Sequence, residues 1–332
     1  MKIKEIILSN FKGVNETTSV EIKPITIFIG ANSSGKSTII HSIATLAQTL
    51  KIQNNSKPLI LDDEQAYVHL GRFIDVIHTK SYKDAIILGF VINNVQLPHF
   101  SKNDKGKENI ELIETNVKVE FKFKCIMRTQ EIVLTHGEYT IGNDKYIVER
   151  GKDDYKLTNM TTKKQIDIIA SSGFIFEIEK QMINNKFLSG YFGDFINFFS
   201  MQNAIKASFN SVMYLGPFRQ PPQRPYQSRG SNPIEVGSMG ESAVTLLANE
   251  IIQLRTRNHI SQIAKWLEIL GMAENIDVNR ILKSDLFDIN ITLKDKTKFS
   301  LADLGYGFSQ VLPVLVQCSF AKKDSMLLFE QP

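Results

Sequence analysis

The feature that most constrains this chain is a nine-residue run at residues 30–38, which reads GANSSGKST. It fits the phosphate-binding pattern G-x-x-x-x-G-K-[ST] at every position, with an apolar run before it and a helical pattern after it. Glycines let successive backbone N–H groups point at one anion, and the N-terminus of the following helix adds positive charge. The run predicts a strand, loop and helix that bind a nucleoside triphosphate. A glycine- and serine-rich turn before an ordinary helix is the alternative.

Each side chain of this loop, the P-loop, has an expected task. Lys36 is expected to reach the β- and γ-phosphates, and the hydroxyl of Ser37 to hold Mg²⁺. The expected cofactors are therefore ATP and Mg²⁺. The expected nucleotide-binding residues of the loop are Gly30, Asn32, Ser33, Ser34, Gly35, Lys36, Ser37 and Thr38.

Composition excludes several classes of protein. The chain has 332 residues, 42% of them hydrophobic and 22% charged, which is ordinary globular usage with room for two or three domains. A net charge of +4 is compatible with a nucleic-acid partner but too weak to indicate one. Two cysteines far apart, Cys125 and Cys318, argue against a disulfide framework and favour the cytoplasm. Because no uninterrupted apolar run approaches a membrane-spanning length, no membrane partner is expected.

Changes of periodicity along the chain suggest an α/β protein in four parts. Strands are expected at residues 3–8 and 19–29, and residues 36–50 have helical spacing. Residues 117–124 alternate strictly between apolar and charged side chains, which is typical of a half-solvated antiparallel strand. The expected parts are the first half of the nucleotide-binding core (1–80), an antiparallel β-rich lobe (81–180), a helical lobe with a Pro- and Arg-rich loop (181–285) and the second half of the core (286–332).

A P-loop protein also needs an acidic residue at the end of a strand to hold Mg²⁺. Residues 326–329 are apolar, and Glu330 follows them directly. A loop with glycine and serine at residues 305–309 precedes an apolar helical stretch, and a helix N-terminus of this kind suits phosphate binding. We therefore expect nucleotide contacts from Gly305, Gly307 and Ser309. A glycine-rich helix start without a special function is the alternative.

These motifs together resemble a known group of ATPases. The resemblance is carried by residues 10–13 (NFKG), the P-loop, residues 214–219 (YLGPFR), residues 303–313 and residues 330–332. They are similar to ABC-type ATPases related to RecF, SMC and OLD proteins, and in particular to a bacterial subgroup found in anti-phage defence operons, the Septu- or PARIS-like ATPases. The resemblance implies an ABC-type P-loop ATPase head with an inserted antiparallel β lobe and a helical lobe.

The resemblance also implies how such a head works. ATP would bind between Lys36 and Ser37 of one subunit and the 305–309 loop of another, so that ATP drives formation of a homodimer or larger homo-oligomer. The paired heads would hydrolyse ATP and control a partner effector, a nuclease or a toxin. Residues 69–78 would form the loop that senses Mg²⁺ and the γ-phosphate. Lys12 would touch phosphate or ribose, unless it is simply a solvated lysine in a turn.

Two functions of other classes stay open at this point. One is a DNA-repair ATPase, similar to RecF and SMC proteins, that clamps DNA. The other is a nearly inactive ATP-dependent scaffold. Arg219, Arg224 and Arg229 leave a similar choice, because arginine suits bidentate phosphate contacts but is equally common on the surface of a stiff loop. The aromatic-rich residues 181–210 are expected in the core, with a partner groove as the alternative.

Three features depart from the ABC pattern. Gly305 stands where the ABC signature has a serine, so the hydroxyl is missing or Ser309 replaces it. Gln331 stands beside Glu330 where a general base is usual; an amide orients water but accepts no proton, which predicts slow hydrolysis. Lys36, Glu330 and Gln331 are the expected catalytic residues. The sequence ends at Pro332, where an ABC ATPase continues, which suggests a fragment of a longer protein.

Overall fold

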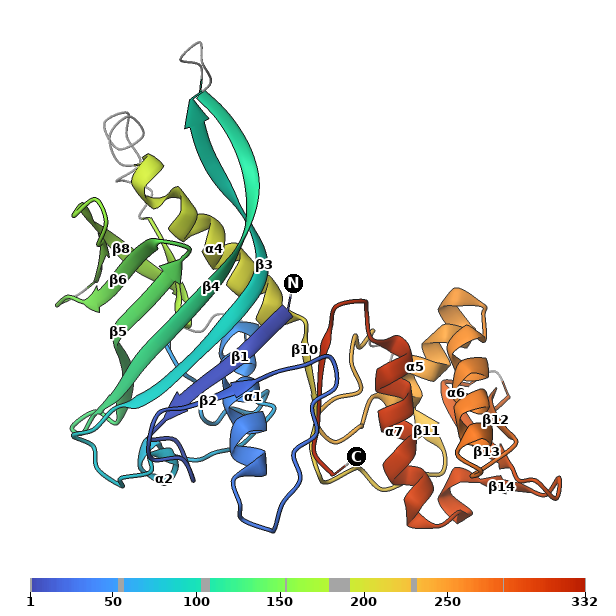
Figure 1. The fold of residues 1–332 in the computed structure, drawn as a ribbon. Helices are drawn as coiled ribbons and strands as arrows, with labels where there is room; N and C mark the ends of the chain where they lie inside the picture. Colours follow the sequence, from blue (N-terminus) through green and yellow to red (C-terminus); the bar gives the residue numbers. More distant parts are fainter. Residues whose placement is uncertain are drawn as a thin grey trace. The chain divides into compact units, whose positions relative to one another are not determined.

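The computed structural model describes residues 2–52, 57–102, 108–152, 154–178, 192–227, 232–282 and 284–331. The chain divides into two compact units, residues 1–211 and residues 212–332 (Figure 1). Helices and strands occur in both units, which confirms the α/β class expected from the sequence. In the described ranges, no helix combines the length and the apolar character that crossing a membrane requires.

The first unit is built on a large antiparallel sheet. Nine of the described strands follow one another in the order β2-β1-β3-β4-β5-β6-β7-β8-β9. β1 and β2, which precede the P-loop, thus share the sheet of the later β-rich segment, because β3 pairs along β1. The strands are β1 (Lys2–Ser9), β2 (Thr18–Glu21), β3 (Ile86–Lys102), β4 (Glu108–Ile126), β5 (Glu131–Ile141), β6 (Asp144–Arg150), β7 (Tyr155–Asn159), β8 (Gln165–Ser172) and β9 (Ile175–Glu177).

The alternating residues of β4 divide between the two faces of this sheet. Val117, Val119, Phe121 and Phe123 are fully buried on the inner face, whereas the charged residues between them face outward. The ring of Phe121 contacts those of neighbouring aromatic residues on other strands, for example Tyr139 on β5 at a centroid distance of 5.7 Å. The half-solvated strand expected from the sequence is therefore confirmed, since side chains on a strand alternate between faces.

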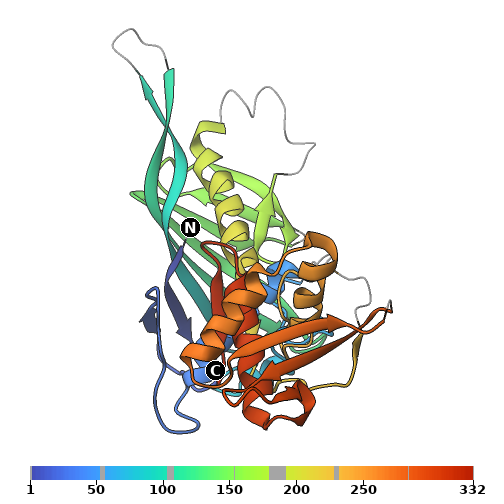
Figure 2. The same cartoon turned by 90° about the vertical axis from the view of Figure 1, so that its right-hand side faces the viewer.

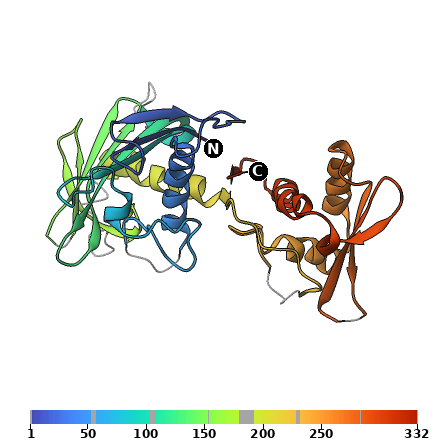
Figure 3. The ribbon, with the colours of Figure 1, turned by 90° about the horizontal axis from the view of Figure 1, so that it is seen from below.

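Two long helices cover the inner face of the sheet, α1 (Lys36–Lys51) and α4 (Phe192–Asn210). They pack against each other, and α4 also lies along β3 (Figure 3). α4 carries Phe195, Phe198 and Phe209 into the core, all fully buried. This confirms the core interpretation for the described part of the aromatic-rich segment; its residues 181–191 lie outside the described residues. A short helix, α2 (Phe73–Val76), completes the unit as described.

The strand expected over residues 19–29 is wrong in its second half. β2 ends at Glu21, and the described residues 25–29 belong to no strand. Ile25, Ile27 and Ile29 are 82%, 74% and 90% exposed. Pro24 cannot donate to a strand ladder, and the Thr26 side chain forms a local turn by accepting from the Lys23 N–H at 2.9 Å. The apolar alternation of residues 25–29 therefore does not predict whether a neighbouring strand pairs with them.

The second unit combines a parallel strand pair with a small antiparallel sheet. β10 and β15 pair in parallel, with Tyr214 opposite Leu328 and Leu215 opposite Phe329. β11, β13 and β12 form the antiparallel sheet, and β14 pairs with β13. The strands are β10 (Val212–Leu215), β11 (Tyr226–Gln227), β12 (Asn275–Arg280), β13 (Leu286–Thr292), β14 (Lys298–Ser300) and β15 (Met326–Phe329).

Helices α6 and α7 pack together in this unit, and α6 lies along β12 (Figure 2). The spacing of apolar residues predicts helices over 241–254 and 260–270 and short strands at 286–293 and 297–300, and the structure confirms all four. The strands β10 and β12 were not expected, because each is short and lacks a clear alternation. The helices are α5 (Ala243–Asn249), a π-helical turn (Glu250–Leu254), α6 (Asn258–Ile269), a 3₁₀ turn (Leu301–Asp303) and α7 (Tyr306–Phe320).

Candidate nucleotide site

The P-loop bends through two residues with left-handed backbone. Gly35 has φ 92° and forms the N-cap of α1, and Ser33 has φ 63°. A β-carbon disfavours such a conformation, which explains a glycine directly before Lys36. The loop side chains from Ala31 to Ser34 are exposed, whereas Thr38 is buried one turn into the helix. The sequence expectation of a loop that opens a helix is thus met at this position.

The ammonium group of Lys36 folds back over its own loop. Nζ lies 2.9 Å from the carbonyl oxygen of Gly30 and 2.6 Å from that of Ala31. The Ser34 N–H makes only a long contact of 3.4 Å with the same Ala31 carbonyl. Phosphate oxygens are stronger acceptors for an ammonium than neutral carbonyls. Nucleotide binding would therefore exchange these local contacts for charged ones.

The NFKG turn of residues 10–13 lies against the first turns of α1. A β-carbon on Gly13 would stand 3.8 Å from Oγ1 of Thr38, and Nζ of Lys12 lies 2.6 Å from Nδ1 of His41. Lys12 is half-buried with a left-handed backbone, φ 49°. It is therefore not the fully solvated turn lysine of the alternative interpretation, because its side chain is directed at the P-loop helix.

The segment expected to sense the γ-phosphate lies on the other side of this turn. Lys12 N–H donates to the carbonyl oxygen of Val76 at 2.6 Å, and the His78 N–H donates to that of Asn10 at 3.2 Å. At its start, Arg72 and Asp75 form an exposed ion pair at 3.1 Å, and the hydrogen bond from Arg72 lowers the pKa of Asp75. The structure thus brings residues 69–78 beside the NFKG turn.

In the second unit, the contacts that hold Glu330 at the end of β15 include three hydrogen bonds. Its N–H donates to the carbonyl oxygen of Leu215 at 3.0 Å. The hydroxyl of Tyr214 donates to its Oε1 at 2.9 Å, and Nη1 of Arg219 donates to its main-chain oxygen at 2.9 Å. Glu330 is only 7% exposed. Gln331, the next residue, is exposed and has a left-handed backbone, φ 49°.

Burial shapes the electrostatics around this carboxylate. It raises the pKa of Tyr214 well above its usual value, and the adjacent Glu330 raises that pKa further, so Tyr214 stays a hydrogen-bond donor. Burial also lowers the pKa of the Arg219 guanidinium. Sequence reasoning missed Tyr214 and Arg219 as partners of Glu330. The motif YLGPFR was a signal, but only the parallel pairing of β10 with β15 brings it beside Glu330.

The three arginines of the Pro- and Arg-rich loop differ in burial and in their contacts. Arg219 is 3% exposed, so the surface interpretation is wrong for it. Arg224 forms an ion pair with Asp303, which lies two residues before Gly305. Arg229 lies outside the described residues. The loop is therefore tied to the two ends of the predicted second half of the site, Glu330 and the start of α7.

The two glycines at the start of α7, Gly305 and Gly307, are open to solvent. Gly305 is the N-cap of α7, and among the described residues no atom lies within 4 Å of where a β-carbon would stand on Gly305 or Gly307. Ser309 is placed differently: it is buried, and its hydroxyl donates to the carbonyl oxygen of Tyr306 at 2.7 Å. To contact a nucleotide, this hydroxyl would first have to give up its hydrogen bond to the Tyr306 carbonyl oxygen.

The oxygen donors expected from the sequence are of the type that Mg²⁺ prefers. No group of three or more His, Cys, Asp or Glu in the described ranges is arranged to hold a metal ion. Mg²⁺ is usually bound by one or two protein oxygens together with substrate phosphates and water. Within its own unit, Ser37 offers a hydroxyl of this kind, and within the other unit Glu330 offers a carboxylate.

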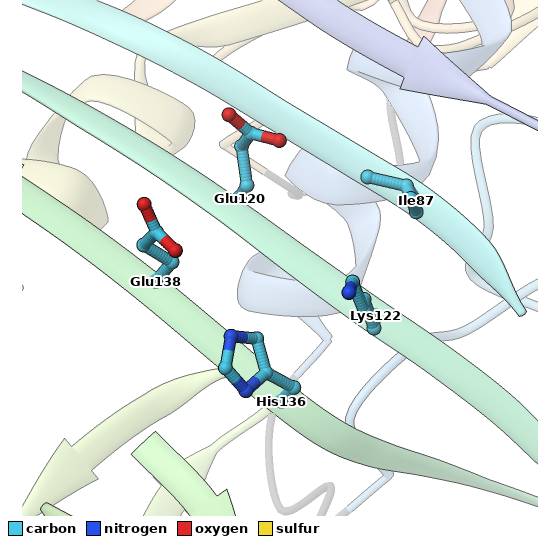
Figure 4. A pocket seen from close by; sticks show the side chains of 5 residues that line it. All are labelled: Ile87, Glu120, Lys122, His136 and Glu138. Atoms are coloured by element: carbon cyan, nitrogen blue, oxygen red, sulfur yellow. The ribbon is translucent and has the colours of Figure 1, made fainter. Parts of the chain in front are cut away.

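A depression of about 120 Å³ lies on the large sheet of the first unit (Figure 4). It is lined by Ile87 of β3, Glu120 and Lys122 of β4, and His136 and Glu138 of β5. Glu120 and Glu138 are direct cross-strand neighbours, which is unfavourable for like charges. Lys118 lies 2.8 Å from Glu120, and Lys145 lies 2.7 Å from Glu138. These pairs offset the repulsion and identify the depression as part of the polar outer face.

Comparison with known proteins supports the nucleotide-binding interpretation. The family described as AAA ATPase domain (AAA_15) matches residues 1–332. No curated protein matches the chain. Among solved structures, the SMC head domain from Thermotoga maritima is similar at 11% sequence identity and a TM-score of 0.33, covering 96% of this chain and 72% of that one. The match over the whole chain shows that it is an ATPase and that it belongs to the AAA ATPase domain family.

Proposed function

We propose that this chain is an ABC-type ATPase head, related to RecF, SMC and OLD proteins, whose copies associate when ATP binds. Lys36 of one copy binds the β- and γ-phosphates, and Ser37 and Glu330 hold Mg²⁺. The 305–309 loop of a second copy contacts the γ-phosphate. The product is a homodimer or a larger homo-oligomer that contains the nucleotide.

The observation that carries this proposal is the environment of Gly305 and Gly307. Neither glycine has the positive φ that would demand glycine, and no described atom stands where their β-carbons would be. Inside a helix, as at Gly307, glycine costs about 1 kcal/mol relative to alanine, whereas Gly305 stands at the N-cap, where glycine is tolerated. Together the two glycines leave the start of α7 open to close approach by another molecule. The positive end of the helix suits an anionic one.

The chemistry assigned to this chain is limited to binding, orientation and slow turnover. Bound Mg²⁺ would neutralise charge on the phosphates. Lys36 would bind and orient the phosphates, and Gln331 would orient a water molecule without accepting its proton. This absence of a base at residue 331 also favours the scaffold alternative, in which ATP holds an assembly and is turned over rarely.

We further propose, from the resemblance alone, that the paired heads control an effector in anti-phage defence. The effector would be a nuclease or a toxin. The product of a neighbouring gene should then copurify with this chain in an ATP-dependent manner. Binding of duplex DNA by the chain alone, with an affinity that falls steeply with salt, would instead support the DNA-clamping alternative.

The association of heads is tested with Gly307→Leu. A leucine at this position fits the helix and the open space around it, but it would stand between α7 and a second copy. In the presence of ATP and Mg²⁺, the molar mass measured by size-exclusion chromatography with light scattering should be that of a dimer for the unmodified chain. The substitution should raise the dimer dissociation constant about tenfold or more, with an unchanged melting temperature.

Gly193→Leu is the matched control. Gly193 lies in the first turn of α4, and no described atom stands within 4 Å of its β-carbon position either. This variant should dimerise like the unmodified chain. Equal dimerisation by both variants would show that the start of α7 is not the interface and would remove the main support for the proposal.

A further inference from the structure

The carboxylate of Glu330 is fixed by residues from outside its own strand. Tyr214 lies on β10 opposite Leu328, and Glu330 follows Leu328 by two positions, on the same face of the pair. The tyrosine ring spans the two-residue distance from Leu328 to Glu330, so its hydroxyl donates to Oε1 of Glu330 at 2.9 Å. Phenylalanine would fill the same space without the hydrogen bond. The contact therefore adds orientation to ordinary packing.

Arg219 fixes the backbone of the same residue. Its Nη1 donates to the main-chain oxygen of Glu330, while its Nε and Nη2 are buried and have no hydrogen-bond partner in the part of the chain that the structure describes. A buried guanidinium with unsatisfied donors is costly. Nearby Glu330, Tyr214 and Tyr306 favour its charged form. The carboxylate and guanidinium thus stabilise each other at the end of β15.

We propose that Tyr214 and Arg219 are positioning residues for Glu330. Tyr214 fixes the direction of the carboxylate, and Arg219 fixes the peptide that follows β15 and leads to Gln331. Tyr306, the first residue of α7, also favours the charged form of the Arg219 guanidinium. This inference rests on the proposed role of Glu330 as a Mg²⁺ ligand.

The proposal predicts which measurements change. Neither Tyr214 nor Arg219 belongs to the P-loop, so their loss should leave the KM for ATP nearly unchanged. Metal affinity and kcat should fall, because both depend on a correctly directed carboxylate. A residue that only supports folding would change stability and leave metal affinity per folded molecule unaltered.

The test uses Tyr214→Phe with Mn²⁺ as the probe. Mn²⁺ binding to the full chain with a non-hydrolysable ATP analogue is measured by electron paramagnetic resonance, and ATP turnover is measured separately. A hydrogen bond to an ionised carboxylate is charge-assisted and corresponds to about a 10- to 100-fold effect. We expect a loss of this size in Mn²⁺ affinity and in kcat, with the KM for ATP within about twofold.

Tyr146→Phe is the matched control, because Tyr146 is also a buried tyrosine whose hydroxyl donates to a backbone oxygen, that of Asp194, at 3.2 Å. It should leave Mn²⁺ affinity and kcat unchanged. For Arg219, Gln should cause a larger loss than Lys, since Lys keeps the charge and one donor. Partial rescue by Lys separates positioning from simple loss of packing.

The outcomes separate this inference from the function on which it rests. Equal Mn²⁺ affinity in Tyr214→Phe and Tyr146→Phe, with Glu330→Gln strongly impaired, would overturn the positioning role and leave Glu330 as the metal ligand. Unchanged Mn²⁺ affinity in Glu330→Gln would overturn the proposed metal site itself. A loss in Tyr214→Phe and in Glu330→Gln, with normal binding in Tyr146→Phe, supports both.

Discussion

The P-loop and the end of β15 differ in how firmly their functional side chains are held before a ligand binds. Among the described residues, Lys36 hydrogen-bonds to two carbonyl oxygens of its own exposed loop. Glu330 is buried and receives hydrogen bonds from two residues that lie more than a hundred positions earlier in the sequence. One region is local and open, whereas the other depends on the tertiary fold.

This difference indicates a division of labour. The P-loop can rearrange around the phosphates, because its present contacts are weak and local. A carboxylate that is already oriented loses little conformational entropy when a metal binds, which is the benefit of preorganisation. The P-loop is therefore free to adapt to a ligand, whereas the carboxylate of Glu330 already has a fixed direction within the second unit.

The largest effect is expected for Lys36→Ala. The ammonium would make charge-assisted hydrogen bonds to phosphate, so its loss should cost about 3–6 kcal/mol of binding free energy and abolish measurable ATP binding. The melting temperature should not change, because the contacts of Lys36 in the free protein are local. Isothermal titration calorimetry measures the binding.

Lys206→Ala, at an exposed position of α4, is the control for this substitution and should bind ATP normally. If Lys36→Ala binds ATP as well as Lys206→Ala does, the P-loop assignment is wrong. If it binds normally but melts at a lower temperature, Lys36 is structural and the comparison drawn above is reversed.

The next effect compares a residue of α1, the helix that follows the P-loop, with a residue of the exposed segment that precedes the loop. Leu46 of α1 is fully buried, so Leu46→Ala should lower the free energy of unfolding by about 2–5 kcal/mol. Ile27 is highly exposed, so Ile27→Ala should change it by less than about 0.5 kcal/mol. Urea denaturation of the full chain measures both.

A loss above about 2 kcal/mol for Ile27→Ala would instead support the buried strand that the sequence predicted. The approach to the P-loop would then be as firmly held as the end of β15. The contrast between the two regions would be confined to the loop itself.

Much of the fold follows from local patterns. The alternation at residues 117–124 and the helical spacing after Lys36 are patterns among residues close together in the sequence. Both elements form where they were expected. Residues 25–29 fail for the opposite reason. Their alternation is strand-like, but a strand also needs a pairing partner, and periodicity carries no information about partners.

The candidate site divides in the same way. The P-loop lies within one continuous stretch, so its residues were identifiable from a motif alone. The partners of Glu330 come from β10 and the loop after it, and their proximity depends on parallel pairing between strands far apart in sequence. Arg219 could be named as a candidate, but its burial could not be known before the fold was.

The smallest effect concerns the general base that is missing beside Glu330. Gln331 is exposed beside the fixed Glu330, and Gln331→Glu keeps its size while adding a carboxylate that can accept a proton from water. We expect kcat for ATP to rise about tenfold, which corresponds to about 1.4 kcal/mol, with unchanged ATP affinity. Gln96→Glu, at an exposed position of β3, controls for the added charge and should not alter turnover. Equal kcat in both variants would mean that the general base does not act from residue 331. The fixed end of β15 would then orient the metal ligand only, and the slow step would depend on the adaptable P-loop.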